Sequence, residues 1–200
     1  MKQYYKLLGD VKMNYKDYTE QYMKETMEIT QTIDKIEIEK AIGILEALRK
    51  SQGRLFILGV GGSAANASHA VNDFRKIAGI EAYAPTDNVA ELTARTNDEG
   101  WNTTFTEWLK TSKLHENDAL LVLSVGGGSE STSLNIKEAV DLALERKAKI
   151  VGIVSRDGGY TKRNADACVL VPVVSEDRIT PHAEGWQGVV WHLIVNALVY

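Results

Sequence analysis

The stretch "ILGVGGSAANASHAVND", residues 57–73, decides the fold, because it passes from a buried strand through glycines into a helix. Glycines at positions 59, 61 and 62 can take positive φ in the turn. Ser63 is placed to cap the helix and to donate a hydrogen bond to an oxyanion. A helix N-terminus with unpaired N–H groups behind such a turn predicts a site for an anion.

Strand-like and helix-like segments alternate after this stretch. Strands are predicted at residues 54–60, 81–85, 119–125, 149–155 and 167–173, with helices at 64–77, within 89–111, at 132–147 and at 185–199. Apolar strands separated by amphipathic helices are typical of a parallel sheet covered on both faces. We therefore predict an α/β fold with a doubly wound parallel sheet. Helical spacing also predicts one or two helices over residues 14–50, with Gly53 ending the last of them.

Composition describes an ordinary globular chain. Its 200 residues are 44% hydrophobic and 25% charged, and no linker or repeat divides them, so we expect one domain over residues 1–200. Within it, residues 14–50 are the N-terminal helices and residues 54–200 the α/β sandwich. A formal net charge of -4 argues against a broad nucleic-acid interface. The single cysteine, Cys168, lies in an apolar strand and is interpreted as a buried hydrophobe.

We expect neither a secretion signal nor a membrane span. The N-terminal residues 1–15 lack the apolar core of a secretion signal. No apolar run approaches the roughly 18 residues that a membrane span needs. We therefore expect a cytoplasmic protein without a membrane partner.

A second glycine loop, "SVGGGSESTS" at residues 124–133, follows another predicted core strand. Neither loop ends in the Gly-Lys-Ser/Thr of a Walker A motif, and the first fails the spacing of the dinucleotide fingerprint. Each loop alone is explained equally well as a structural turn with a helix cap. Together, their hydroxyl groups and backbone amides, without Lys or Arg, predict a site for a phosphate monoester rather than a triphosphate.

At these loops the sequence resembles the sugar isomerase (SIS) domain family, and within it the phosphoheptose isomerases. The resemblance rests on "GVGGSAANASH", "TDNVAELTARTNDEGW", "LLVLSVGGGS", "KIVGIVSRDGG" and "ADACVLVPV", followed by a C-terminal helix with a histidine. It implies a flavodoxin-like SIS fold, conversion of sedoheptulose 7-phosphate to a manno-heptose 7-phosphate, and a role in heptose biosynthesis. It also implies a homotetramer with residues 14–50 at subunit contacts.

The resemblance assigns roles to individual residues. It implies that Asp98 contacts the sugar and that the substrate phosphate is held by the two loops, through Ser63, Ser124, Ser129, Gly61, Gly62, Gly126 and Gly127. The metal and catalytic set of the family is His, Glu, Gln and His. The matching positions here hold His69, Asp73, Glu184 and His192, so two of the four residues differ.

The resemblance and the chemistry of this quartet predict a divalent metal site. His69 and Asp73 are four residues apart and share a helix face. Imidazole and carboxylate ligands suit Zn²⁺, with Fe²⁺, Mn²⁺, Co²⁺ or Ni²⁺ also possible. Eight residues of unbroken helix rise about 12 Å, so Glu184 and His192 can reach one ion only if Glu184 precedes the helix or lies at its frayed start. Alternatively, Asp73 is a solvated surface residue and His192 a core histidine.

The expected chemistry is aldose–ketose isomerisation through a cis-enediol, assisted by the metal. His192 and Asp73 are expected to share the proton transfers, and Glu184 to act as a ligand or as the replacement base. His115 and His182 are interpreted as surface or loop residues. The four tryptophans are interpreted as core or subunit-interface residues, with the alternative that Trp101, close to Asp98, lines the sugar pocket.

Two alternatives belong to other functional classes. One is a SIS protein that needs no catalysis and binds a sugar phosphate and a protein partner, as the DnaA initiator-associating proteins do. The other is a sugar-phosphate sensor, although no DNA-binding module accompanies this sequence. A site that had lost its catalytic role would more often hold apolar or neutral residues. The extra carboxylate at position 184 therefore favours an altered but working metal site over a non-catalytic protein.

Overall fold

The computed structural model describes residues 14–200. Its parallel strands are β1 (Arg54–Leu58), β2 (Glu81–Tyr83), β3 (Ala119–Leu123), β4 (Lys149–Val154) and β5 (Ala167–Leu170). Its α-helices are α1 (Tyr15–Thr32), α2 (Lys35–Lys50), α3 (Gly62–Lys76), α4 (Val89–Asp98), α5 (Thr104–Thr111), α6 (Leu134–Glu145), α7 (Gly159–Asn164) and α8 (Ile179–Ala197). Two short 3-10 turns are η1 (Pro85–Asp87) and η2 (Glu176–Arg178). The expectation about a secretion signal concerns residues 1–15, most of which lie outside the described residues.

The five strands follow the order β2-β1-β3-β4-β5, with every neighbouring pair parallel. This order is the flavodoxin-like one, so the predicted doubly wound sheet is confirmed. The central strand β3 is buried along its whole length because helices cover both of its faces. In this order the chain reverses direction across the sheet between β1 and β3, which is where ligands bind in such folds.

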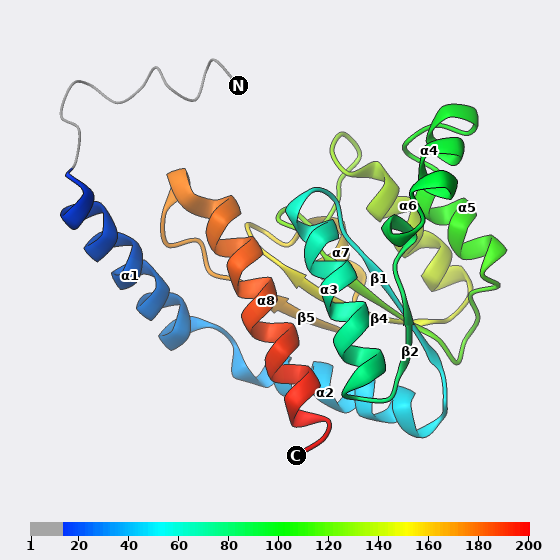
Figure 1. Cartoon of the computed structure of the whole chain (residues 1–200), viewed down its shortest axis with the longest axis horizontal. Coiled ribbons are helices and arrows are strands. Elements are labelled where there is room, and N and C mark those ends of the chain that lie inside the picture. Colours follow the sequence, from blue (N-terminus) through cyan, green and yellow to red (C-terminus); the bar gives the residue numbers. More distant parts are fainter. Residues whose placement is uncertain (1–13) are drawn as a thin grey trace.

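Helices form one layer on each face of the sheet (Figure 1). One apolar core joins α1, α2, α3 and α8 to the sheet, and it includes Phe74 and Trp191. The other core joins α5 and α6 to the opposite face, around Phe105 and Leu109. Successive side chains of a strand point to opposite faces of the sheet. Leu55 therefore belongs to the first core and its neighbour Phe56 to the second.

Local sequence starts several helices where side chains can cap them. Asn14 accepts a hydrogen bond from the amide of Asp17 at 3.0 Å and begins α1. Asp34 accepts from the amide of Ile36 at 2.9 Å and begins α2. Both are the caps that the residue types favour. Helix α2 ends at Lys50, slightly before the predicted stop at Gly53.

The C-terminal helix differs most from the prediction. It begins at Ile179 rather than at residue 185, and Pro181 lies in its first turn, where proline is tolerated because no N–H is needed. His182, expected on the surface, is therefore a buried helical residue with 4% of its surface exposed. Helix α7 was not predicted either. No helix among residues 14–200 is long and apolar enough to span a membrane.

Candidate active site

A cavity of about 380 Å³ lies beyond the carboxyl ends of β1 and β3, at the switch point of the sheet. Both glycine loops contribute to it. Its lining residues are Val60, Ser63, Ser124, Val125, Gly126, Gly128, Ser129, Thr132, Ser133, Arg156, Asp157 and Thr180. Six of these twelve residues carry a hydroxyl group, as the sequence predicts for a site that accepts a phosphate.

The second loop is fixed to α7 by its glycine carbonyl groups, since Gly128 accepts a hydrogen bond from the amide of Tyr160 at 2.9 Å. Gly127 takes φ +68° and accepts hydrogen bonds from both the amide and the hydroxyl of Thr161, at 2.9 and 2.8 Å. A Cβ at Gly127 would lie 2.0 Å from the carbonyl oxygen of Gly158, so glycine is required there. The amides of Val125 and Gly126 have no acceptor within residues 14–200, which leaves them available to an anion.

The first loop departs from the predicted cap. Gly61, with φ +65° and no side chain, is the residue that precedes α3, and Ser63 lies inside the helix. Ser63 is 2% exposed and lines the cavity. Its expected role as a helix cap is therefore wrong, because the turn needs a glycine conformation at position 61.

Arg156 was missed by the sequence analysis, which expected a cavity without Lys or Arg. It lines the cavity and holds a left-handed backbone with φ +57°. Left-handed backbone at a non-glycine residue is costly and is concentrated at functional sites. The sequence did hold a signal for Arg156. The segment "SRDGG", residues 155–159, is a polar run with two glycines that directly follows the core strand β4.

Helices α3 and α8 pack side by side and run in the same direction (Figure 1). Near their N-termini, a Cβ at Gly62 would lie 2.6 Å from Cδ of Glu184. One turn further, Asn66 donates to the carbonyl of Glu184 at 2.9 Å and to Oε1 of Gln187 at 3.1 Å. Polar residues thus form a seam between the two helices, leading away from the cavity.

The far end of the seam brings together His69, Asp73 and His192. One ligand atom from each lies within 4.8 Å of the other two. Oδ2 of Asp73 is 3.9 Å from Nε2 of His69 and 3.7 Å from Nε2 of His192. Ligands about 2 Å from a tetrahedral ion are separated by roughly 3.3 Å, so small side-chain movements would complete the site.

His192 has its ring orientation fixed by its surroundings. Its Nδ1 donates to the carbonyl oxygen of Gly188 at 2.7 Å, which leaves the lone pair of Nε2 free. The ring stacks on Trp191 with centroids 3.5 Å apart. Asp73 is 9% exposed, so its alternative interpretation as a solvated residue does not hold. The donor set of two imidazoles and one carboxylate fits a divalent transition metal.

Glu184 is not part of this metal group. Because α8 is already helical from Ile179, Glu184 lies within the helix, and the condition set for it to share an ion with His192 is not met. Its carboxylate lies instead at the N-terminus of α3, where the helix dipole favours negative charge. Asn66 and Gln187, which connect the two ends of the seam, were not singled out from the sequence.

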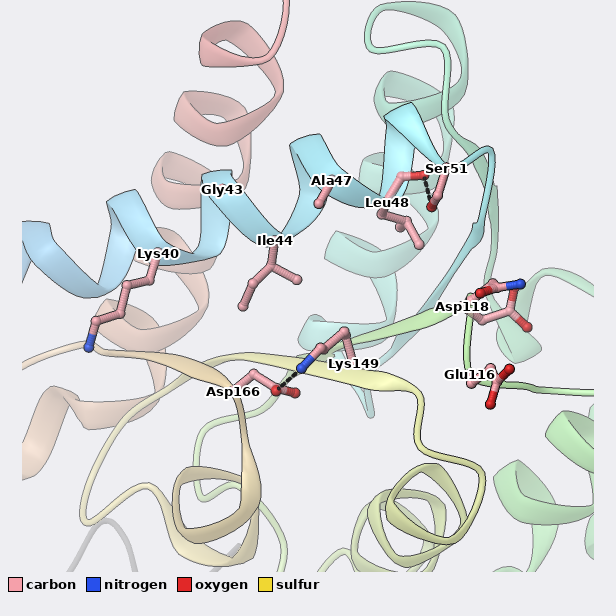
Figure 2. Close-up of a pocket in the computed structure, with 11 residues that line it drawn as sticks. Lys40, Gly43, Ile44, Ala47, Leu48, Ser51, Glu116, Asp118, Lys149 and Asp166 are labelled. Atoms are coloured by element: carbon pink, nitrogen blue, oxygen red, sulfur yellow. Dashed lines mark hydrogen bonds and ion pairs between the residues drawn. The ribbon is translucent and has the colours of Figure 1, made fainter.

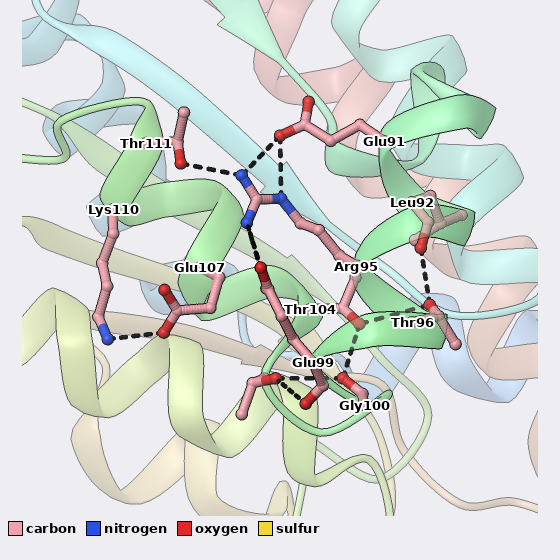
Figure 3. A network of polar contacts seen from close by, with 11 residues as sticks. Glu91, Leu92, Arg95, Thr96, Glu99, Gly100, Thr104, Glu107, Lys110 and Thr111 are labelled. Carbon is pink, nitrogen blue, oxygen red and sulfur yellow. Dashed lines mark hydrogen bonds and ion pairs between the residues drawn. The ribbon is translucent and has the colours of Figure 1, made fainter.

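Asp98 and Trp101 lie away from the cavity that the glycine loops form. Asp98 is exposed and accepts a hydrogen bond from the side chain of Asn97 at 2.7 Å. Trp101 is 40% exposed and does not line this cavity, so the alternative that it borders a sugar there gains no support. Nearby, Arg95 binds Glu91 and Thr111 at 2.9 Å each and joins α4 to α5 (Figure 3). This segment is held firmly and presents Asp98 outward.

A larger cavity, of about 650 Å³, lies at the opposite edge of the sheet (Figure 2). It is bounded by α2 and by residues that precede or begin β3, β4 and β5, including the ion pair of Lys149 and Asp166. Amino ends of parallel strands are not where ligands bind in open α/β sheets. We therefore do not assign the active site to this cavity, although it is the larger of the two.

Residues 17–155 match the family model of the SIS domain. The chain belongs to the SIS domain family. This match confirms the resemblance that the two glycine loops indicated.

The similar curated SIS proteins include phosphoheptose isomerases. That of Nitratiruptor sp. is 32% identical over 78% of this chain and 87% of its own length. That of Geobacter metallireducens is 34% identical over 78% and 82%. A solved phosphoheptose isomerase from Francisella tularensis has the same fold, with a TM-score of 0.78, 22% identity, and coverage of 93% of this chain and 98% of that one.

Proposed function

We propose that this SIS protein is a phosphoheptose isomerase that converts sedoheptulose 7-phosphate to D-glycero-D-manno-heptose 7-phosphate. The observation that supports this proposal most strongly is that α3 connects two sites, with Ser63 in the hydroxyl-rich cavity and His69 in the metal group. Six helical residues span about 9 Å, which suits an extended sugar with its phosphate at one end and its carbonyl at the other. The names of the SIS relatives support the same substrate.

The phosphate is expected to occupy the cavity of the two glycine loops. Ser124, Ser129 and the free amides of the second loop would donate hydrogen bonds to its oxygens, together with Ser63 at the start of α3. Gly61, Gly62, Gly126 and Gly127 would permit the close approach of the backbone. Arg156 supplies the positive charge that the serines lack. Asp98 remains a proposed sugar contact on the exposed α4 segment.

Proton transfer is proposed to involve His192 and Asp73. One of them removes a proton from C-1 of the ketose while the carbonyl oxygen at C-2 is protonated, which yields a cis-enediol. The hydroxyl at C-1 then loses its proton and C-2 gains one, which yields the aldose. Because Nδ1 of His192 is engaged by Gly188, only Nε2 is left to act, and it transfers a proton only while it is not bound to the metal. While Nε2 holds the ion, the proton transfer falls to the carboxylate of Asp73, which has two oxygens.

His69, Asp73 and His192 would hold the metal, which we propose to be Zn²⁺. A divalent ion there supplies Lewis-acid stabilisation of negative charge on the sugar oxygens. Glu184, placed between the cavity and this group along the seam, is proposed to border the sugar rather than to bind the metal.

Residues 1–200 are proposed to form one SIS domain that assembles as a cytoplasmic homotetramer. Helix α1 extends along one side of the molecule (Figure 1) and buries only Glu25 and Ile29 within the chain. Its outer side exposes Met23 and Met27, each 55% exposed. Large apolar side chains gathered on one helix are typical of a subunit contact.

The decisive experiment incubates the purified protein with sedoheptulose 7-phosphate in D₂O and follows the C-1 and C-2 protons by NMR. Exchange that a chelator abolishes and Zn²⁺ restores, with an aldose phosphate appearing, supports the isomerase and its metal together. Binding of the phosphate ester without exchange would contradict the isomerase and leave the alternative of a non-catalytic SIS protein with a protein partner.

A further inference from the structure

Helix α1 is joined to the rest of the chain by a buried ionic cluster. Glu25 of α1, 2% exposed, accepts hydrogen bonds from Nε and Nη2 of Arg178 at 2.8 and 2.7 Å. It also accepts from Nε2 of His182 at 2.8 Å and from Gln21 at 2.9 Å. We call these four residues the Glu25 cluster. The forked contact with the guanidinium is the strong, directional form of a charge pair.

Aromatic rings cover the Glu25 cluster. Tyr22 stacks on His182 with centroids 4.5 Å apart, and the guanidinium of Arg178 lies 5.7 Å from the ring centre of Tyr18. Within residues 14–200 the only apolar residue of α1 that is fully buried is Ile29. The position of α1 on the fold therefore depends strongly on the cluster.

The same cluster holds the start of α8. Arg178 is the residue that precedes this helix, and it makes no side-chain capping bond to it. His182 lies in its first turns. Between them, Thr180 lines the phosphate cavity, and Glu184 follows against the N-terminus of α3. Glu25 thus anchors both sides of the short segment that borders the substrate.

We propose that Glu25 is a positioning residue for the substrate site, which couples the docking of α1 to the placement of Thr180 and Glu184. This inference rests on the proposed function for the identity of the ligand. The metal group is left out of the coupling, because His69 and Asp73 lie on α3 and His192 lies more than two turns beyond His182. Loss of the cluster should therefore separate sugar-phosphate binding from metal binding.

The test compares Glu25→Gln with Glu20→Gln in the full-length, Zn²⁺-loaded protein. Glu20 is a matched control, since it lies on α1 and its carboxylate pairs, within residues 14–200, only with the exposed Lys16, at 4.0 Å. We expect Glu25→Gln to raise the Kd for sedoheptulose 7-phosphate by about tenfold or more, with the Kd for Zn²⁺ unchanged. Hydrogen exchange of residues 176–188 should rise in this variant and stay unchanged in Glu20→Gln.

Unchanged exchange of residues 176–188 in Glu25→Gln, or the same change in Glu20→Gln, would overturn the proposal. If Glu25→Gln does not fold, the same two measurements are made on Arg178→Lys. This variant keeps the positive charge but cannot form the paired hydrogen bonds of the guanidinium with Glu25. If the wild-type protein does not bind the heptulose phosphate, the proposed function fails, while the exchange measurement still decides whether Glu25 orders the start of α8.

Discussion

His192 donates its Nδ1 hydrogen to the carbonyl oxygen of Gly188, one turn earlier on α8, at 2.7 Å. This bond assigns the tautomer and directs Nε2 toward Oδ2 of Asp73, 3.7 Å away. A histidine held in this way can bind a metal or accept a proton without first reorienting.

Replacement of His69 or His192 by alanine should lower the affinity for Zn²⁺ at least tenfold and reduce kcat by about 10²-fold or more. Each variant removes one of the three groups that the structure brings together. His115→Ala is the control, because its side chain is 52% exposed and lies in a distant loop. Zinc titration with a chromogenic chelator and initial rates would measure both effects; wild-type values in either variant would contradict the assignment.

Glu184→Gln should tighten sugar-phosphate binding severalfold and leave zinc affinity unchanged. The variant removes a negative charge at the N-terminus of α3, next to the cavity, without touching the metal group. Isothermal titration with the sugar phosphate and with Zn²⁺ separates the two effects. A tenfold loss of zinc affinity would instead make Glu184 a ligand. Glu145→Gln, at a surface site with the side chain 67% exposed, controls for the change in net charge.

Arg156→Gln should raise KM for the sugar phosphate by about 10-fold to 100-fold, since a hydrogen bond to a charged group contributes about 1.5–3 kcal/mol. The effect on kcat should be smaller, because the phosphate is remote from the reacting carbons. Arg146→Gln, whose side chain is 49% exposed on the surface, is the comparison variant. Steady-state kinetics with equal KM in both variants would exclude Arg156 from the phosphate site.

Glu25→Gln should lower the free energy of unfolding at neutral pH by roughly 3–5 kcal/mol, the cost of breaking a buried ion pair. The hydrogen bonds from Arg178 lower the pKa of Glu25 from 4.5 to about 2. A carboxyl with a depressed pKa contributes stability above its unfolded pKa and loses it as the pH falls through the folded value. The difference between wild type and variant should therefore shrink between pH 4.5 and pH 2, measured by urea unfolding.

Much of the fold follows from local pattern. Residues 57–73 alone predict a strand, a glycine turn and a helix, and the structure contains all three as β1, the turn at Gly61 and α3. His69 and Asp73 share a face because their spacing is a property of any helix. The cavity serines were predictable for a similar reason, since loops that follow parallel strands must meet at one edge of the sheet.

Other features depended on contacts between distant segments. The start of α8 at Ile179, which excludes Glu184 from the metal group, coincides with an ionic contact between Arg178 and Glu25, 153 residues earlier. Arg156 reaches the cavity because β4 lies beside β3 in the sheet. The sequence by itself therefore determined the sheet, the glycine turns and the His69–Asp73 pair, all set by short-range spacing. Only the tertiary structure decided which charged groups join them, because burial and pairing of charges arise from packing between elements that are remote in the chain.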